Sequence, residues 1–196
     1  MWDGERRSIS ISTGKERLMS EENRKAIRIS VRNLVEFVLR SGDIDNRRSG
    51  NAQKDAMLAG GRIHRKIQKR MGSGYRAEVP LKHEVQDEEQ EITLLVEGRA
   101  DGIFTENGIP VIDEIKGMYT DISRLEEPIE VHLAQAMCYG YFYCCDKDLD
   151  GIRLQMTYCN LETEEIKRFQ TERSREELET WFSSVVHEYF KWARYL

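Results

Sequence analysis

The feature that most constrains the fold is a period of two in the hydrophobic residues of the middle of the chain. Apolar and polar side chains alternate over 75–85, again over 92–96 after an acidic QDEEQ segment, and a further apolar stretch covers 109–116. Such alternation predicts β-strands with one buried face. The turn residues Asn107-Gly108 predict a hairpin, so we expect an antiparallel meander of three or four strands.

Hydrophobic residues three and four positions apart predict helices on both sides of this meander. A chain with helices before and after a central meander is typical of the α/β class, with a mostly antiparallel or mixed sheet flanked by helices. Residues 1–26 are polar and aperiodic, so we expect a flexible arm there and a single domain over 27–196. The helices are expected at about 31–40, 51–71, 129–145 and from Arg175 to the end, with later strands at 152–160 and 165–170.

The chain carries no sign of a membrane span or an export signal. No apolar run approaches the ~20 residues that cross a bilayer, and the N-terminus lacks an apolar leader, so we expect a cytoplasmic protein without membrane contact. The four cysteines show no C-x-x-C spacing, which predicts reduced thiols.

Charge is distributed unevenly along the chain. The net charge is −5, yet residues 1–83 hold 19 basic against 10 acidic side chains and residues 84–196 hold 11 against 25. The densest basic stretch, within the helix expected at 51–71, has two interpretations: a solvated helix face, or a surface that tracks the phosphates of a nucleic acid. The Gly60-Gly61 pair in that helix suggests a close approach of another backbone or a ligand. The candidate phosphate contacts share one helical stripe and are Arg62, Arg65, Lys66 and Lys69.

A carboxylate and an ammonium share one face of the strand expected at 109–116. Side chains two positions apart project together, so Glu114 and Lys116 lie on one face while Asp113 and Ile115 point the other way. This pair suits phosphodiester hydrolysis, although an isolated E-x-K is more often an exposed ion pair. Asp101 lies upstream at the start of the adjoining strand, where a hairpin would return it beside Glu114, although an Asp-Gly turn is an alternative.

The order of these motifs resembles the PD-(D/E)xK nuclease superfamily, specifically its RecB-like branch. The resemblance covers roughly residues 28–170 and includes the form G-R-x-D-G, with Ala100 where the proline of the family name would stand. It implies a restriction-endonuclease-like fold and a metal-dependent deoxyribonuclease, exonuclease or endonuclease. The motifs that carry it are, in order, His64, Asp101, Glu114-Ile115-Lys116 and Gln135 with Tyr139.

The resemblance also implies a role for each motif residue. Lys116 would position or activate the attacking water, and Gln135 and Tyr139, four apart on one helical face, would contact the DNA backbone or brace this lysine. Without the other motifs, Gln135 and Tyr139 indicate only a half-buried amphipathic helix. His83, His132 and His187 compete with His64 as a metal ligand. The ligands of Mg²⁺ or Mn²⁺ would be His64, Asp101, Glu114 and the Ile115 carbonyl.

A narrower resemblance is to the nuclease region at the N-terminus of bacterial DinG-like, XPD-related helicases. The segments that carry it are ISVRNLVEFVLRSGDID, AGGRIHRKIQ and TYCNLETEEIKRF. It implies DNA repair or replication processing with a helicase domain, in the same chain or in trans, and the chain ends within an amphipathic helix as a fragment would. Iron–sulfur relatives place a cysteine before the histidine motif, and here none precedes Cys138, so we expect no cluster.

Two other function classes stay open at this point. The chain could be a catalytically inactive DNA-binding module of a helicase, although binding alone has no need of the full set of metal-binding residues. It could also be a structural interaction domain whose E-x-K is a surface pair, which would leave the ordered motifs as coincidence.

Overall fold

The computed structural model describes residues 25–39, 50–87 and 91–193, and for residues 50–57 the backbone alone. Within these ranges no helix is both long enough and apolar enough to cross a membrane. The elements follow one another as β1 (Lys25–Ser30), α2 (Val31–Leu39), α3 (Gly50–Arg70), β2 (Arg76–Asp87), β3 (Ile92–Glu106), β4 (Ile109–Met118), the 3-10 helix η1 (Ile122–Arg124), α4 (Glu130–Lys147), β5 (Gly151–Asn160), β6 (Ile166–Ser174) and α5 (Arg175–Ala193).

The strands form one mixed six-stranded sheet. Its order is β1-β3-β4-β5-β6, and β2 pairs with the other edge of β3. The β2–β3 and β3–β4 pairs are antiparallel, as the predicted meander requires. The β5–β6 pair is also antiparallel, whereas β1–β3 and β4–β5 are parallel. A parallel neighbour needs a crossover, and α4 supplies it between β4 and β5. The predicted fold class, an α/β domain with a mixed sheet flanked by helices, is confirmed.

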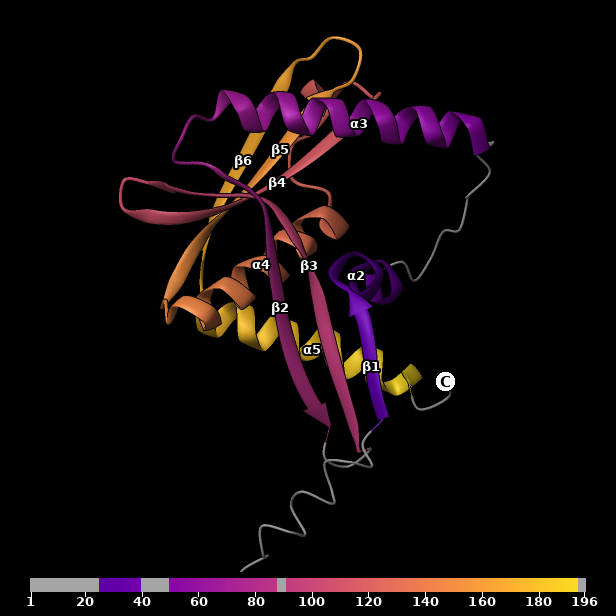
Figure 1. The fold of residues 1–196 in the computed structure, drawn as a ribbon, viewed down its shortest axis with the longest axis vertical. Helices are drawn as coiled ribbons and strands as arrows, with labels where there is room; N and C mark the ends of the chain where they lie inside the picture. The colour runs from indigo at the N-terminus through magenta and orange to yellow at the C-terminus, as the bar shows by residue number, and fades with distance from the viewer. Residues whose placement is uncertain (1–24, 40–49, 88–90, 194–196) are drawn as a thin grey trace, which may run out of the picture.

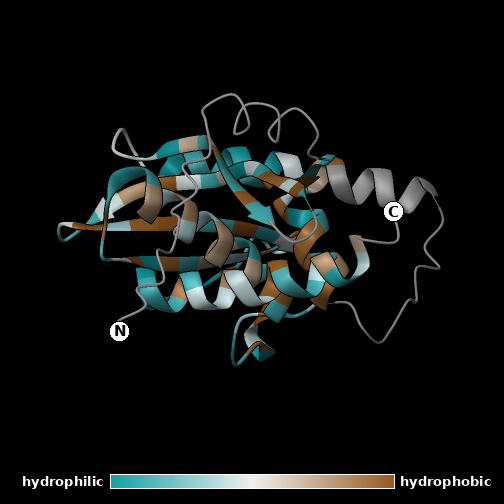
Figure 2. Cartoon of the chain, turned by 90° about the horizontal axis from the view of Figure 1, so that it is seen from below, coloured by the Kyte–Doolittle hydropathy of each residue, from teal (hydrophilic) through white to brown (hydrophobic). Residues whose placement is uncertain are grey.

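Helices cover the two faces of the sheet unequally. Helices α2, α4 and α5 pack on one face around the main core, which includes Leu34, Phe142 and Phe182. Helix α3 lies across one end of the sheet, apart from α4 and α5 (Figure 1). Its Ile63 and Ile67 pack with Ile115 of β4 in a second, smaller core. Brown and teal stretches are mixed over the helices and strands in Figure 2. Burial alternates from residue to residue along much of β2 and β3, which is the period of two that the sequence displays.

Strand β3 changes partners along one of its edges. On the edge opposite β2 it pairs with β1 over Ile92–Glu97 and with β4 over Gly102–Glu106. Residues 98–101 have no strand partner on that edge in the described part of the chain, so the sheet forks there. Asp101 therefore lies inside a strand of 15 residues and not at a strand start, because β2 keeps β3 continuous through this stretch.

One other expectation about the fold needs correction. Strand β1 begins at Lys25, so the last two residues of the expected arm are ordered, and 27–30 form a strand that the sequence analysis did not predict. Residues 1–24, and with them the rest of the arm, lie outside the described residues. The hairpin at Asn107-Gly108 is present, with φ of +51° and +81° at these two residues, as a tight turn between twisted strands requires.

Candidate active site

Strand β4 presents Glu114 and Lys116 on the face that α4 covers. The Lys116 Nζ donates a hydrogen bond to Glu114 Oε1 at 2.7 Å, and the Glu114 side chain is 5 % exposed. Asp113 points to the opposite face, is fully buried, and accepts hydrogen bonds from the hydroxyls of Tyr75 at 2.9 Å and Thr157 at 2.6 Å. The alternation of the strand therefore separates two buried carboxylates into different environments.

Asp101 reaches β4 because the sheet forks at its position. The β3–β4 ladder ends at the Gly102–Asp113 pair. Two residues further along β4, the backbone N–H of Ile115 donates to Asp101 Oδ2 at 2.7 Å. The Asp101 carboxylate thus accepts the Ile115 N–H hydrogen bond that a backbone carbonyl of β3 would accept if the ladder continued. This contact places Asp101 beside the strand that carries Glu114.

Helix α3 approaches the same point from the other side. The Nδ1 atom of His64 lies 3.4 Å from Asp101 Oδ1. One turn later, Gln68 Nε2 donates to the Asp101 carbonyl oxygen at 2.9 Å and to Glu78 Oε1 at 3.1 Å. Gln68 was not predicted as a site residue, although its spacing of four from His64 places both on one helical face.

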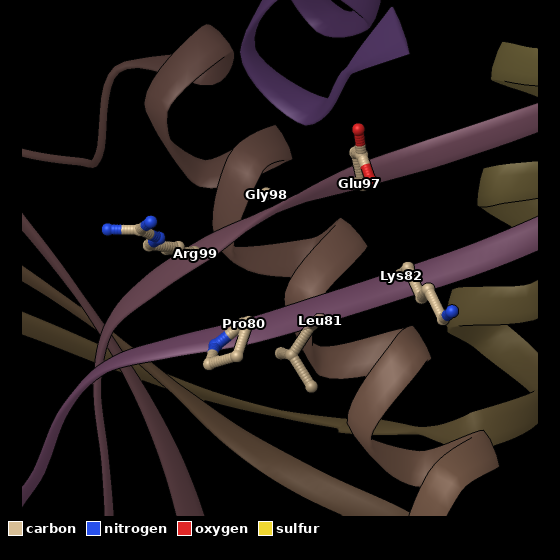
Figure 3. Close-up of a pocket in the computed structure, with 6 residues that line it drawn as sticks. All are labelled: Pro80, Leu81, Lys82, Glu97, Gly98 and Arg99. Carbon is tan, nitrogen blue, oxygen red and sulfur yellow. The ribbon is translucent and has the colours of Figure 1, made fainter. Parts of the chain in front are cut away.

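Helix α4 supplies the remaining motif residues. Lys116 Nζ donates a second hydrogen bond, to Gln135 Oε1 at 2.9 Å, and Gln135 is buried. Tyr139, one turn later, is buried under the unpaired stretch of β3: a Cβ at Gly98 would lie 2.5 Å from its hydroxyl oxygen. Figure 3 shows Gly98 at the point where β3 passes over a helix. Gly98 lines a hollow of about 510 Å³. Glycine at this position lets the strand and the tyrosine approach each other.

The carboxylate of Glu114 is in an unfavourable environment. Its Oε2 is buried and has no hydrogen-bond partner among the described residues. Burial raises the pKa of Glu114 to about 7, Lys116 opposes this rise, and the charge of Asp101 adds to it. Burial alone would lower the pKa of His64, but the hydrogen bond to Asp101 and the charge of Asp101 raise it overall.

The competing histidines lie elsewhere. His132 lies near Lys116, its Nδ1 is 3.4 Å from the Tyr158 hydroxyl, and burial together with the charge of Lys116 lowers its pKa to about 4. His83 stacks on Phe142 in the main core, and it lines a hollow beside α5 together with His187. Among the described histidines, His64 is the one within 4 Å of a carboxylate oxygen at this site.

The donor atoms suit a hard divalent cation. In the described ranges no three side chains of His, Cys, Asp or Glu are arranged as a finished metal-binding cluster. The unpartnered Glu114 Oε2, the Asp101 carboxylate and the His64 imidazole are nevertheless the donor types that Mg²⁺ and Mn²⁺ accept. A cation would also satisfy the buried oxygen, so the residues fit the implied metal.

The basic stretch of α3 faces away from the second core. Arg62, Arg65 and Lys69 are exposed, whereas Lys66 forms an ion pair with Glu164 in the turn between β5 and β6. The glycine pair of this helix makes no close approach: a Cβ at the first would meet nothing within 4 Å, and at the second only the Arg65 guanidinium at 3.7 Å. The suspicion of close packing there is not supported by the described residues.

Comparisons with known proteins give a shared fold but no family. No family model and no curated protein matches this chain. Among solved structures, the crystal structure of SSO0001 aligns over 88% of this chain and 82% of its own, with a TM-score of 0.53 and 16% identity. An alkaline exonuclease (LHK-Exo) from Laribacter hongkongensis aligns over 86% of this chain and 90% of its own, with a TM-score of 0.45 and 14% identity. The likeness to SSO0001 shows a common fold.

Proposed function

We propose that this protein is a nuclease that hydrolyses DNA phosphodiester bonds with a divalent metal ion. The observation that carries the proposal is the buried carboxylate of Glu114, which has one oxygen on Lys116 and the other without a partner in the described part of the chain. Leaving a buried carboxylate oxygen unpaired costs about 1–3 kcal/mol or more, so a purely structural ion pair has no reason to retain it. Asp101 and His64 lie beside it with further metal-binding atoms.

In this proposal the metal is held by carboxylate, imidazole and carbonyl groups. The donors are Glu114, Asp101, His64 and the carbonyl oxygen of Ile115. When bound, Mg²⁺ or Mn²⁺ would polarise the scissile phosphate and lower the pKa of a bound water. The Ile115 N–H holds Asp101 in place for this role.

Lys116 acts on the attacking water or on the phosphate. Its ammonium has three N–H donors, and Glu114 and Gln135 accept two of them, which leaves one for a water or a phosphate oxygen. Gln135 has a positioning role, because it fixes the ammonium between α4 and β4. Tyr139 supports the same region by packing under Gly98.

The wider setting of the proposed activity rests on the sequence resemblance. We propose that the protein processes DNA in repair or replication, in the cytoplasm, together with a DinG-like helicase domain in the same chain or in trans. Exposed Arg62, Arg65 and Lys69 would contact DNA phosphates without reading the sequence. Lys66 would join them if its ion pair with Glu164 opens.

A cleavage assay tests the proposal. Purified protein should degrade labelled single-stranded or duplex DNA in Mg²⁺ or Mn²⁺ and lose the activity in EDTA, and Glu114→Gln should abolish it. Glu162→Gln, at an exposed position, is the matched control and should cleave like the parent. Equal activity in EDTA would refute the metal mechanism. DNA binding without any cleavage would instead identify the inactive DNA-binding module.

A further inference from the structure

A third hollow lies on the α3 side of the sheet, beyond the end of that helix. Its volume is about 470 Å³, within the range of about 300–1,000 Å³ that small-molecule sites occupy. The strands β3, β5 and β6 and the residue that follows α3 provide its lining, which consists of Met71, Phe104, Glu106, Gln155, Arg168 and Gln170.

The floor of this hollow is polar and holds two glutamines, of which Gln155 is buried and Gln170 is exposed. One register row crosses four strands and brings Asp113, Gln155 and Gln170 side by side. Gln170 Nε2 donates to Gln155 Oε1 at 2.8 Å, and Gln155, which is 3 % exposed, contacts Thr157 in turn. An exposed amide held in a fixed position, such as that of Gln170, can hydrogen-bond the edge of a nucleobase.

One wall of the hollow is an aromatic ring held in a fixed position. Phe104 is half-buried and stacks on Tyr75, with ring centroids 5.7 Å apart and an interplanar angle of 27°. Tyr75 is itself fixed by its hydrogen bond to Asp113, and it fills the space above Gly102, where a Cβ would lie 1.8 Å from the ring. A flat, fixed ring beside amide groups suits a nucleobase, because every base can stack on an aromatic face.

Helix α3 connects this hollow to the candidate active site. His64 and Gln68 lie on one face of α3, and Met71 continues this row directly after the helix ends. His64 contacts the Asp101 carboxylate, Gln68 contacts the Asp101 carbonyl, and Met71 lines the hollow. Seven residues separate the first from the last, which corresponds to about 10 Å at roughly 1.5 Å per residue. That length spans about three stacked nucleotides of one strand, at roughly 3.4 Å each. Arg168 stands exposed at the rim, where a cation can meet a phosphate.

We propose that this hollow binds one unpaired base of the DNA strand being cut, within about three nucleotides of the scissile phosphate. The inference rests on the proposed nuclease function, because it names part of the substrate. The base stacks on Phe104 and forms a hydrogen bond with Gln170, whose amide Gln155 holds in place. Arg168 contacts the neighbouring phosphate.

Abasic substitution tests the inference without requiring cleavage. Short fluorescein-labelled single strands, each with one abasic position moved along the sequence, are titrated with the protein in Ca²⁺ and followed by fluorescence anisotropy. We expect one position at which loss of the base weakens binding roughly tenfold, the size of one base–aromatic stack. Phe104→Ala should bind the intact and abasic strands alike, and Gln170→Ala should reduce the difference in affinity between them. Phe37→Ala, at an exposed aromatic residue of α2 on the other face of the sheet, should keep the difference in affinity between the intact and abasic strands.

The outcomes separate this inference from the function on which it rests. Equal binding at every abasic position, or a base dependence that survives in both hollow variants, overturns the base site. Gln170 is exposed, so its variant decides the matter if the loss of Phe104 unfolds the protein. If the protein cleaves DNA in Mg²⁺ but its DNA binding does not depend on the base, only the base-binding role of the hollow is refuted. Base dependence without cleavage refutes the nuclease while leaving a DNA-binding hollow.

Discussion

Glu114→Gln should make the metal-free protein more stable at neutral and alkaline pH although it removes a proposed metal ligand. In the folded protein burial raises the pKa of Glu114 to about 7, whereas the ordinary value of the unfolded chain is 4.5. The folded state therefore binds this proton more tightly than the unfolded state. The resulting stability is fully present below pH 4.5 and is lost as the pH rises through about 7.

The size of this effect follows from the two pKa values. A difference between about 7 and 4.5 corresponds to about 3 kcal/mol of unfolding free energy. The amide of Gln does not titrate, so the stability of Glu114→Gln relative to the parent should increase by about this amount between pH 5 and 8.5. For a chain of this length, about 3 kcal/mol corresponds to a rise in Tm of about 10 °C.

Thermal or urea unfolding in EDTA across this pH range measures the difference directly. Glu162→Gln, which removes an exposed carboxylate outside the site, is the matched control. Adding Mg²⁺ should then stabilise the parent and not Glu114→Gln, because a ligand stabilises only the form that binds it. If the stability difference between Glu114→Gln and the parent does not change with pH, Glu114 is not a buried carboxylate that ionises at a raised pKa, and the reasoning is refuted.

Three further predictions concern activity, DNA binding and packing. Lys116→Ala should lower kcat for DNA cleavage at least about 100-fold, whereas Asp113→Asn on the opposite face should lower it less than about tenfold, and the reverse order in steady-state kinetics would refute the assignment of the two faces. Lys66→Ala/Lys69→Ala should weaken binding to all DNA sequences alike and reduce the slope of log binding constant against log salt concentration by about one per lost phosphate contact. Binding is measured in Ca²⁺ from about 50 to 200 mM salt, and an unchanged slope would assign this helix face to solvent. Gly98→Ala should destabilise the protein by about 1–3 kcal/mol in urea unfolding, because its Cβ would lie 2.5 Å from the tyrosine hydroxyl of α4, and a change below about 0.5 kcal/mol would contradict this packing.

The parts of the site that depend on local periodicity could be predicted from the sequence. A strand places side chains two apart on one face, so Glu114 and Lys116 were expected together and meet at 2.7 Å. A helix places side chains four apart on one face, which put Gln135 and Tyr139 together on α4. The hairpin at Asn107-Gly108 was predictable because these residues tolerate the positive φ of its turn.

The parts that depend on distant partners could not be predicted. Strand β1 is short and largely exposed, and it exists because β3 offers an edge more than 60 residues later. The fork at Asp101 follows from β3 changing neighbours, which no local pattern records. The pairing of Lys66 with Glu164 joins residues 98 positions apart. These features arise from tertiary pairing, and they decide where the metal donors and the basic helix lie.

Anomalous diffraction from crystals soaked in Mn²⁺ tests the central claim most directly. We expect one strong Mn²⁺ peak bonded to Oε2 of Glu114, which has no partner among the described residues, and to the carboxylate of Asp101, with His64 and the carbonyl of Ile115 as further ligands. The same soak of Glu114→Gln crystals should show no peak there. A saturating soak of the parent that leaves this point empty, or that places the ion away from both carboxylates, would contradict the assignment of these residues as a metal centre.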